Sequence, residues 1–406
     1  MSQQPGDQFS ARRRVAIVVT LGLLSGLGPF TIDLYLPTFP ALKTDLSITD
    51  PQVQVTLSAT TIGFALGQLV VGPLSDRFGR RRPLLIAATL HIVASVMVAI
   101  APNVYFLTAM RALQGIGAAG SAVVAMAMAR DLFSGRRLVR MLSRLALING
   151  LAPIIAPLIG SWMVTLMDWR GVFWVLATYG AVLLVLVLLF IVETRPPHER
   201  TRGGLRQLRA AYAAVLGDRL FVGVWLTASC AFAGLFSYIS TSSVLLQETF
   251  GLSETQFGVV FAVCSVGVFV GVQSGSRLTT RFGPQWVLVG GSTGMILTAL
   301  ALLGLDALGG GYLPLVPAMF GFTLTFGACT PAAQVLALQH HRANSGVAAS
   351  LMGALNMTMA AIVGPVIGQF ELTSAAPMAV SMLVCAVLAT AALWVIARPR
   401  QVKFTL

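Results

Sequence analysis

The sequence predicts an all-α integral membrane protein, with twelve transmembrane helices arranged as two pseudosymmetric six-helix bundles. The first observation is composition: 56% of the 406 residues are hydrophobic, 10% are charged, and the mean hydropathy is +0.83. Soluble domains carry about 25% charged residues, so this chain cannot cover a water-facing surface of the required size. The other two observations are a series of long apolar stretches and short motifs that recur between the two halves.

The apolar stretches are long enough to cross a bilayer, which requires about 20 residues per helix. Glycine and proline inside them are tolerated where neighbouring helices satisfy the freed backbone groups. The expected spans are residues 15–38, 52–75, 83–101, 104–130, 138–167, 171–192, 219–247, 255–276, 285–305, 311–338, 345–370 and 375–397. We therefore expect an N-terminal bundle at 1–193, a basic cytoplasmic linker at 194–217 and a C-terminal bundle at 218–406.

The basic residues predict the orientation. Of the 27 Lys and Arg residues, 24 fall in alternate loops on one side or near the termini, whereas Lys43 and Arg170 lie on the other side and Arg111 lies within a span. Because cytoplasmic loops are enriched in Lys and Arg, we expect a multi-pass protein of the bacterial inner membrane with both termini cytoplasmic. The net charge of +13 follows from these loops, so nucleic acid is not an expected partner.

The linker contains a helical pattern of its own. Leu205, Leu208, Tyr212 and Val215 share one helical face beside basic residues. That pattern is typical of a helix on an anionic leaflet, and a regulatory partner site is the alternative.

Short motifs repeat in the same order in both halves. Leu74–Gly79 matches Leu278–Gly283 at an offset of 204, and Ala156–Gly160 matches Gly364–Gly368 at an offset of 208. A third match, Ala109-Met110 with Ala318-Met319, aligns Arg111 with Phe320. The first match aligns Asp76 with Thr280, so the charged residues concentrate in the first half. Such a duplicated scaffold is typical of transporters whose halves rock about a central site.

Four segments carry a family resemblance that covers nearly the whole chain. They are D-L-Y-L-P-T-F-P-A-L (Asp33 to Leu42), G-P-L-S-D-R-F-G-R-R-R (Gly72 to Arg82), R-A-L-Q-G-I-G-A-A-G (Arg111 to Gly120) and G-L-A-P-I-I-A-P-L-I-G (Gly150 to Gly160). With them the chain resembles the major facilitator superfamily, specifically the twelve-helix drug/proton antiporters of the Bcr/CflA type. The resemblance associates the third segment with proton coupling and the fourth with antiport. It identifies no substrate.

Asp33 and Arg111 are the expected proton-coupling residues. Burial disfavours the charged form of an intramembrane acid and a nearby cation favours it, so such a carboxyl can exchange protons. Arg111 cannot be neutralised and must face a polar cavity or a partner. At about 1.5 Å per residue, Asp33 and Arg111 lie about 27 Å and about 30 Å above the basic side. The alternatives are an interfacial cap for Asp33 and a structural role for Arg111.

The second segment predicts a gate on the cytoplasmic side. Gly72 is expected to allow close helix packing, and Gly79 to supply a positive φ angle in the turn. Asp76 and Arg80 are expected to form a charge relay with Arg130 and Asp131, with Arg77 beside them. In the family this cluster is thought to latch the outward-facing state. The alternative, the positive-inside rule alone, explains the arginines but not Asp76.

The fifth span carries four residues that thin or distort a helix, namely Gly150, Pro153, Pro157 and Gly160. Missing amide donors and close approach predict a pivot and a seal against proton leak. Ordinary packing of small residues is the alternative.

Substrate contacts are expected from aromatic and amide side chains within the spans, because amphiphilic compounds bind apolar cavities with few polar groups. The candidates are Phe30, Tyr35, Gln114, Asn149, Phe236, Tyr238, Gln334 and Asn356, with Tyr35 and Asn149 first.

The sequence thus predicts a proton-coupled exporter of small lipophilic drugs, and the alternative is an exporter of an endogenous metabolite such as an amino acid or sugar. An importer and a membrane-embedded enzyme are less consistent with the motifs. The four Cys and four His residues form no ligand cluster, and no ATP-binding loop is present. We therefore expect no metal and no cofactor beyond the proton gradient, and a monomer.

Overall fold

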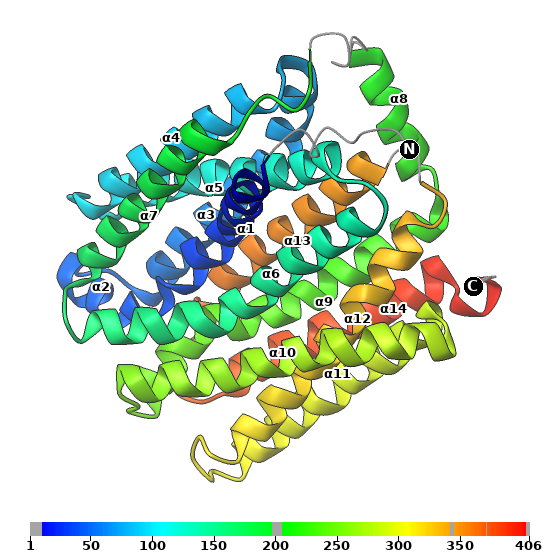
Figure 1. The fold of residues 1–406 in the computed structure, drawn as a ribbon. Coiled ribbons are helices and arrows are strands. Elements are labelled where there is room, and N and C mark those ends of the chain that lie inside the picture. Colours follow the sequence, from blue (N-terminus) through cyan, green and yellow to red (C-terminus); the bar gives the residue numbers. More distant parts are fainter. Residues whose placement is uncertain (1–9, 197–204, 342–344, 371, 403–406) are drawn as a thin grey trace. The chain divides into compact units, whose positions relative to one another are not determined.

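The computed structural model describes residues 10–196, 205–341, 345–370 and 372–402, and all regular structure in them is helical. Twelve of the described helices are long and apolar enough to cross a membrane, so the predicted fold class is confirmed (Figure 1). They are α1 (Ala11–Asp33), α3 (Asp50–Phe78), α4 (Arg81–Ala99), α5 (Val104–Leu132), α6 (Gly135–Val164), α7 (Trp169–Phe190), α9 (Arg219–Val244), α10 (Glu254–Phe282), α11 (Pro284–Ala307), α12 (Leu315–Leu338), α13 (Ser345–Ile367) and α14 (Ala376–Ala392).

Six shorter elements lie between these helices or follow the last of them. They are η2 (Leu36–Thr38), α2 (Phe39–Leu46), α8 (Leu205–Leu216), η3 (Leu245–Thr249), η4 (Leu393–Ala397) and η5 (Pro399–Gln401). The first expected span, 15–38, ends earlier, at Asp33. Pro37 has no amide hydrogen to donate to the Asp33 carbonyl, and its ring would crowd that carbonyl in a continued helix, so Pro37 favours a break there. Asp33 is therefore the last residue of its helix.

The chain forms two compact units, Met1–Thr38 with Ala59–Arg202 and Phe39–Ser58 with Gly203–Leu406. Helix α3 begins in the second unit and ends in the first. Its beginning is held within the second unit, where Gln54 Nε2 donates to the Ser240 carbonyl at 2.6 Å. Lys43 pairs there with Asp50 at 2.6 Å and with Glu248 at 2.7 Å.

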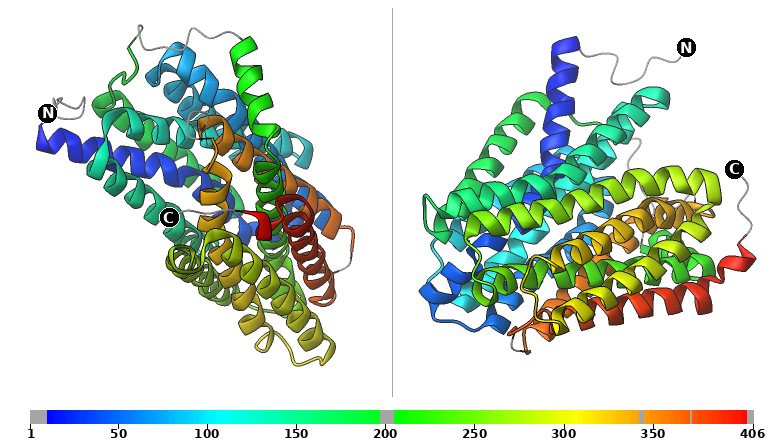
Figure 2. Two further views of the ribbon diagram at one scale, coloured as in Figure 1. Left: turned by 90° about the vertical axis from the view of Figure 1, so that its right-hand side faces the viewer. Right: turned by 90° about the horizontal axis from the view of Figure 1, so that it is seen from below.

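Each unit repeats the same packing. In the first unit α1 packs against α5, α6 and α7, and α4 packs against α5 and α7. In the second unit α9 packs against α12, α13 and α14, and α11 packs against α12 and α14. The right-hand view of Figure 2 shows the helices of the second unit (yellow-green to red) running alongside one another. The predicted duplication is therefore visible in the pairs of helices that touch.

Glycines fix the register of the repeat. A Cβ atom on Gly63 would lie 2.0 Å from the Ala112 carbonyl oxygen, and one on Gly271 would lie 2.1 Å from that of Leu324. A Cβ atom on Gly67, which corresponds to Gly271, would lie 2.8 Å from the Ile116 carbonyl oxygen. Because Gly67 and Gly271 occupy equivalent positions, the residues that they meet, Ile116 and Leu324, are equivalent too. This aligns α5 with α12 at an offset of 208 residues.

The register of 208 corrects one expectation from the sequence. Arg111 corresponds to Met319, one residue before the Phe320 that the short Ala-Met match had suggested. Two shared residues could not define the register, whereas backbone contacts at the glycines do. The charged position of the first unit is thus an apolar core position in the second, since Met319 is fully buried.

Helix α8 packs against the core of the second unit. Val215 is fully buried in a cluster with Phe221 and Leu393, and Tyr212 packs against the same cluster. Tyr212 and Val215 therefore contact protein, which differs from the expected helix on the lipid surface. The side chains of Leu205 and Leu208 lie outside the described residues.

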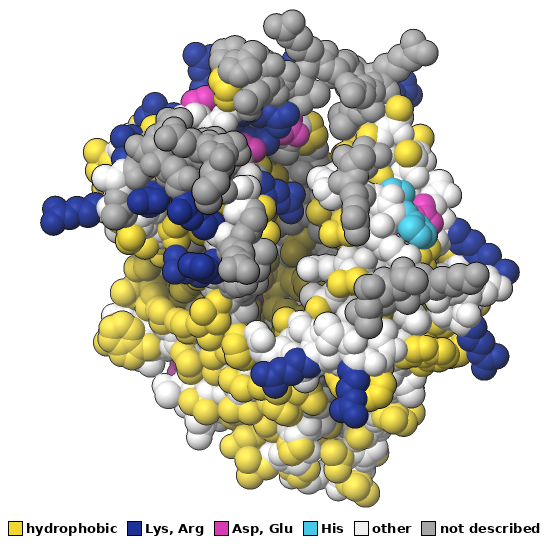
Figure 3. All heavy atoms as spheres, turned by 45° about the vertical axis from the view of Figure 1, so that its right-hand side comes forward, with side chains coloured by type: hydrophobic (Ala, Val, Ile, Leu, Met, Phe, Trp, Pro, Cys, Tyr) yellow, Lys and Arg dark blue, Asp and Glu magenta, His cyan; other side chains and the backbone are white. Residues whose placement is uncertain are grey.

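An acid and two histidines join α9 to the end of α12. Asp218 accepts from the Leu220 amide at 2.9 Å, and its Oδ2 lies 3.1 Å from His340 Nδ1 and 3.0 Å from His341 Nε2. Figure 3 shows histidine (cyan) and acidic (magenta) side chains together at the surface of the face it draws. Partial burial raises the pKa of Asp218, but hydrogen bonds from His340 and the Leu220 amide outweigh this effect, so the net pKa lies below its ordinary value.

Candidate functional site

Asp33 is a nearly buried acid at the end of α1. Its exposed fraction is 5%, and no hydrogen bond or ion pair joins it to another residue within the described part of the chain. The Leu34 amide, which follows it, donates to the Phe30 carbonyl at 3.2 Å and closes the helix. A carboxyl without a fixed partner in this setting is free to bind a proton or a ligand.

Arg111 lies fully buried in α5 of the same unit. Its Nη1 donates to the Thr31 carbonyl at 3.1 Å and to Gln114 Oε1 at 2.6 Å. The guanidinium also lies 4.4 Å from the centre of the Tyr35 ring and 5.4 Å from that of Phe173. Because aromatic faces attract cations, these rings help to stabilise a charge that has no carboxylate partner among the described residues.

Polar side chains of α1, α4 and α5 complete a closed network with Arg111. Gln114 Nε2 donates to Ser95 Oγ at 2.8 Å, and Ser95 Oγ donates to the His91 carbonyl at 2.7 Å. His91 Nε2 lies 3.0 Å from Thr31 Oγ1, which itself donates to the Leu27 carbonyl at 2.6 Å. With the Thr31 hydroxyl directed at the Leu27 carbonyl, the arrangement favours the His91 tautomer that carries its proton on Nε2.

His91, Thr31 and Ser95 belong to no motif of the sequence and were not predicted as site residues. The signal for His91 is its position within an apolar span, because an intramembrane histidine indicates a polar site. His91 and Ser95 are one turn apart, so they share a face of α4. Their partners on α1 and α5 are remote in sequence and became visible only in the packed structure.

No direct ion pair joins Asp33 to Arg111 in the described part of the chain. Thr31 and Tyr35, which contact Arg111, lie on one side of the end of α1. On a helix Asp33 is rotated by about 200° from Thr31. Arg111 therefore does not pair with Asp33 as expected. It is linked to Asp33 only through the α1 backbone, by its hydrogen bond to the Thr31 carbonyl.

The acid and arginine of the second motif form the expected ion pair. Arg80 Nη1 lies 2.7 Å from Asp76 Oδ1, and Arg80 Nε lies 2.9 Å from Asp131 Oδ2. Arg80 also donates to Ser75 Oγ at 2.8 Å and is only 6% exposed. Arg130 is exposed, and no ion pair of Arg130 is seen among the described residues. Arg80 thus joins α3 to the end of α5 without Arg130.

The chain after α7 contributes three residues that the sequence analysis did not single out. Glu193 Oε1 accepts from the Arg80 amide at 2.7 Å, and Thr194 Oγ1 donates to Asp131 Oδ2 at 3.0 Å. Arg195 pairs with Asp76 through Nη1. These three residues belong to no sequence motif. They reach Arg80, Asp131 and Asp76 only because the end of α7 lies beside them in the fold.

The three other residues of this motif differ in what they do. Gly79 has a φ of 91°, and Gly283 in the repeat has a φ of 85°. A Cβ atom on Gly72 would make only an ordinary contact, 3.5 Å from Val123, so close packing does not require glycine there. Arg77 lies 5.4 Å from the ring centre of Phe78.

Helix α6 approaches the end of α1 closely. It contains Gly150, Pro153, Pro157 and Gly160, and a Cβ atom on Gly160 would lie 2.5 Å from the Leu34 carbonyl oxygen. Proline lacks an amide hydrogen, so both prolines remove helical hydrogen bonds. The helix therefore contacts α1 directly beside Asp33.

The substrate candidates of the first unit are mostly engaged within it. Asn149 Nδ2 donates to Ser25 Oγ at 3.0 Å and links α6 to α1. Tyr35 is buried, and Phe30 packs 5.8 Å from Tyr179. Gln114 belongs to the Arg111 network.

The substrate candidates of the second unit occupy varied surroundings. Phe236 and Tyr238 are buried, and Tyr238 stacks on Phe261 with ring centres 5.4 Å apart. Asn356 Oδ1 accepts from Ser229 at 2.8 Å. Gln334 is exposed.

Within the described residues, no group of three or more His, Cys, Asp or Glu side chains could hold a metal ion.

The fold and the buried polar site define a membrane transporter. Residues 21–367 match the model of the Major Facilitator Superfamily, and the chain belongs to this family. It is thus a multi-pass bacterial membrane protein and a transporter, not an enzyme, and the resemblance stated from the motifs is confirmed.

Curated relatives resemble the chain over most of its length. It is 34% identical over 398 residues to the uncharacterized MFS-type transporter YdgK of Bacillus subtilis, covering 96% of this chain and 98% of the relative. It is 30% identical to a bicyclomycin resistance protein homolog of Haemophilus influenzae, covering 92% and 94%. It is 29% identical to the multidrug resistance protein MdtL of Escherichia coli, covering 83% and 86%.

Solved structures share the fold at low identity. A D-xylose-proton symporter superposes with a TM-score of 0.71 at 16% identity, covering 95% of this chain and 98% of the symporter. The nucleoside transporter NupG superposes with a TM-score of 0.72 at 13% identity, covering 94% and 99%.

Proposed function

We propose that this transporter exports small lipophilic drugs or antibiotics across the bacterial inner membrane in exchange for protons. The observation that carries the proposal is Asp33, which is 5% exposed and has no fixed partner in the described part of the chain. The names of two relatives, a bicyclomycin resistance protein homolog and a multidrug resistance protein, support drugs as the cargo.

In this mechanism, proton and substrate compete for Asp33. Outward release of the substrate accompanies proton uptake by the carboxylate, and inward release of the proton restores the charge that attracts the next substrate. Arg111 does not neutralise Asp33 directly. Its hydrogen bond to the Thr31 carbonyl fixes the end of α1, so that the position of Asp33 depends on how α1, α4 and α5 pack.

The proposal assigns two further roles. Asp76, Arg80 and Asp131 latch the cytoplasmic ends of α3 and α5 in one of the alternating states. Helix α6 seals the end of α1 against proton leak, for which the contact between Gly160 and the Leu34 carbonyl is the support. Both termini are cytoplasmic because 24 of 27 basic residues fall on the side of the termini.

The test is transport by purified protein in proteoliposomes with an imposed pH gradient, over a panel of lipophilic drugs, amino acids and sugars. We expect drug movement that follows the gradient. Asp33→Asn removes the ionisable group while preserving shape, and it should lower gradient-driven transport by about 100-fold or more, the lower range for loss of a proton-transfer group.

Asp306→Asn is the matched control, because its amide oxygen can still accept from the Ala375 amide that Asp306 binds at 2.9 Å. It should retain driven transport. Undiminished driven transport by Asp33→Asn would remove Asp33 from the mechanism. Movement of amino acids or sugars, with no drug moved, would favour the metabolite exporter.

A further inference from the structure

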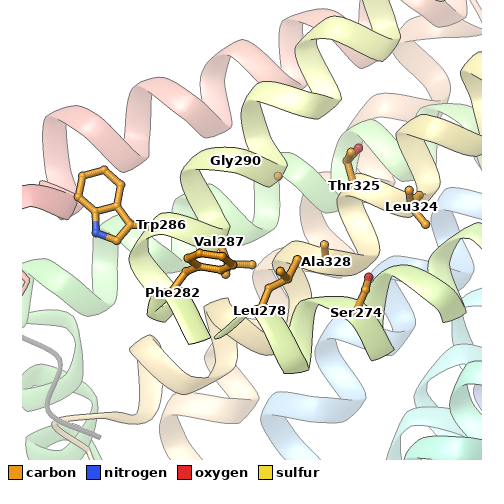
Figure 4. A pocket seen from close by; sticks show the side chains of 10 residues that line it. Ser274, Leu278, Phe282, Trp286, Val287, Gly290, Leu324, Thr325 and Ala328 are labelled. Atoms are coloured by element: carbon orange, nitrogen blue, oxygen red, sulfur yellow. The ribbon is translucent and has the colours of Figure 1, made fainter. Parts of the chain in front are cut away.

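An open groove runs between α10, α11 and α12 of the second unit. Its volume is about 440 Å³, within the about 300–1,000 Å³ typical of ligand sites. Figure 4 shows the side chains of three helices around it, with Leu278, Phe282 and Trp286 toward one end. The lining residues are Ser274, Leu278, Phe282, Trp286, Val287, Gly290, Gly291, Leu324, Thr325 and Ala328. None of them belongs to the Asp33–Arg111 region.

The mouth of the groove is apolar and exposed. Leu278 is 40%, Phe282 55% and Trp286 45% exposed, and all three lie on membrane-spanning helices. Gly290 supplies the hollow, because a Cβ atom there would meet nothing within 4 Å. An exposed apolar mouth on helices that are long and apolar enough to cross a bilayer suits contact with lipid.

The two hydroxyl groups in the lining are already used. Ser274 Oγ donates to the Val270 carbonyl at 2.8 Å, and Thr325 Oγ1 donates to the Gly321 carbonyl at 2.9 Å. The groove therefore presents hydrocarbon surface to its occupant. A ligand that needs polar partners inside the groove, as most amphiphilic drugs do, would lose hydrogen bonds on entering.

Positive charge lies at the end of the groove. The Arg281 guanidinium is 5.2 Å from the ring centre of Phe282, a lining residue. Arg277 is exposed one turn earlier on the same helix. Neither arginine has an acidic partner among the described residues. Trp286, another lining residue, is of a type enriched where membrane meets water.

We propose that this groove binds one acyl chain of an anionic phospholipid, with its phosphate held by Arg281 and Arg277. An apolar trough with satisfied hydroxyls fits a hydrocarbon chain, and two unpaired arginines at its end complement a negative headgroup. This site is independent of the proton site, so it stands or falls separately from the proposed function.

The test uses delipidated protein and native mass spectrometry. Phosphatidylglycerol and phosphatidylcholine with identical oleoyl chains are added in equal amounts, and bound lipid is counted. We expect one phosphatidylglycerol retained in preference to phosphatidylcholine. Gly290→Phe fills the trough and should abolish that retained lipid. Gly304→Phe is the matched control, since Gly304 is another exposed glycine of α11 whose Cβ would also meet nothing within 4 Å; it should change nothing.

Removal of the charge gives a separate result. The double variant Arg277→Gln with Arg281→Gln should lose the preference for phosphatidylglycerol, by about fivefold for each arginine, while still binding acyl chains. Photo-crosslinking of unmodified protein with a diazirine-acyl phosphatidylglycerol checks the position without any variant, and labelled peptides should contain Leu278, Phe282 or Trp286.

Three outcomes would overturn the proposal. They are equal retention of both lipids by the unmodified protein, retention by Gly290→Phe equal to that by Gly304→Phe, and crosslinks confined to other helices.

Discussion

Arg111 keeps a positive charge within the first unit, and none of the described carboxylates lies beside it. Two hydrogen bonds from Nη1 and two aromatic rings surround the guanidinium. The planar group suits this environment because it stacks on rings and donates in fixed directions. The sequence located the charge but could not identify these partners. Thr31, Gln114 and Phe173 come from three helices and Tyr35 from the turn after α1, and only packing brings them together.

A lysine at this position tests whether charge alone suffices. Arg111→Lys keeps the charge, but a tetrahedral ammonium cannot lie flat against the Tyr35 ring while it donates to the Thr31 carbonyl and to Gln114. We expect loss of gradient-driven transport and a loss of stability of about 1–3 kcal/mol, the range for a hydrogen bond to a charged group with its buried partners left unpaired. Thermal unfolding in detergent and transport in proteoliposomes measure the two effects. Wild-type transport by Arg111→Lys would show that only the charge matters.

At the scale of the helix, two motif glycines predicted to allow close packing behave differently. A Cβ on Gly160 would lie 2.5 Å from the Leu34 carbonyl oxygen, whereas one on Gly72 would lie 3.5 Å from Val123. These two glycines cannot be separated from the order of residues, because the space available to a Cβ is set by the neighbouring helix. The turn at Gly79 was easier to predict, since its positive φ angle is a local property.

Alanine substitutions should separate these glycines. Gly160→Ala forces α6 away from α1 and should cost about 1–3 kcal/mol through overpacking. It should also increase proton leak, because α6 then no longer packs against the Leu34 carbonyl beside Asp33. Gly72→Ala should leave the thermal midpoint and leak unchanged. The measurements are thermal unfolding and the decay of a pH gradient in proteoliposomes; equal behaviour of both variants would contradict the assigned contact.

The whole molecule is a structural repeat that carries an asymmetric polar network. Helix α4 corresponds to α11 at an offset of 204 residues, and α5 corresponds to α12 at an offset of 208. In the second unit, the positions equivalent to the four network residues of α4 and α5 are all buried and apolar. His91, Ser95, Arg111 and Gln114 correspond to Met295, Ala299, Met319 and Phe322. Duplication supplies the scaffold, and substitution confines the charged network to the first unit.

The orientation of the whole chain can be tested by cysteine labelling. Leu308 directly follows α11 and is 81% exposed, and we expect it outside the cell. Thr280 lies in the last turn of α10, before α11 begins, and we expect it inside the cell. In intact cells a membrane-impermeant maleimide should label Leu308→Cys and leave Thr280→Cys unlabelled until the cells are opened. The unsubstituted protein controls for its own cysteines. The reverse pattern would place the termini outside.

The sequence by itself determined the membrane class, the twelve spans, the repeat and the positions of Asp33, Arg111 and the Asp76–Arg80 pair. These follow from composition, from apolar length and from the cost of charge in lipid, all of which can be read along one chain. Tertiary structure alone decided that Arg111 faces Thr31 and Tyr35 instead of Asp33, that Glu193 joins Arg80, and that α10–α12 enclose a groove. Such contacts depend on the rotation and separation of packed helices, which the order of residues does not specify.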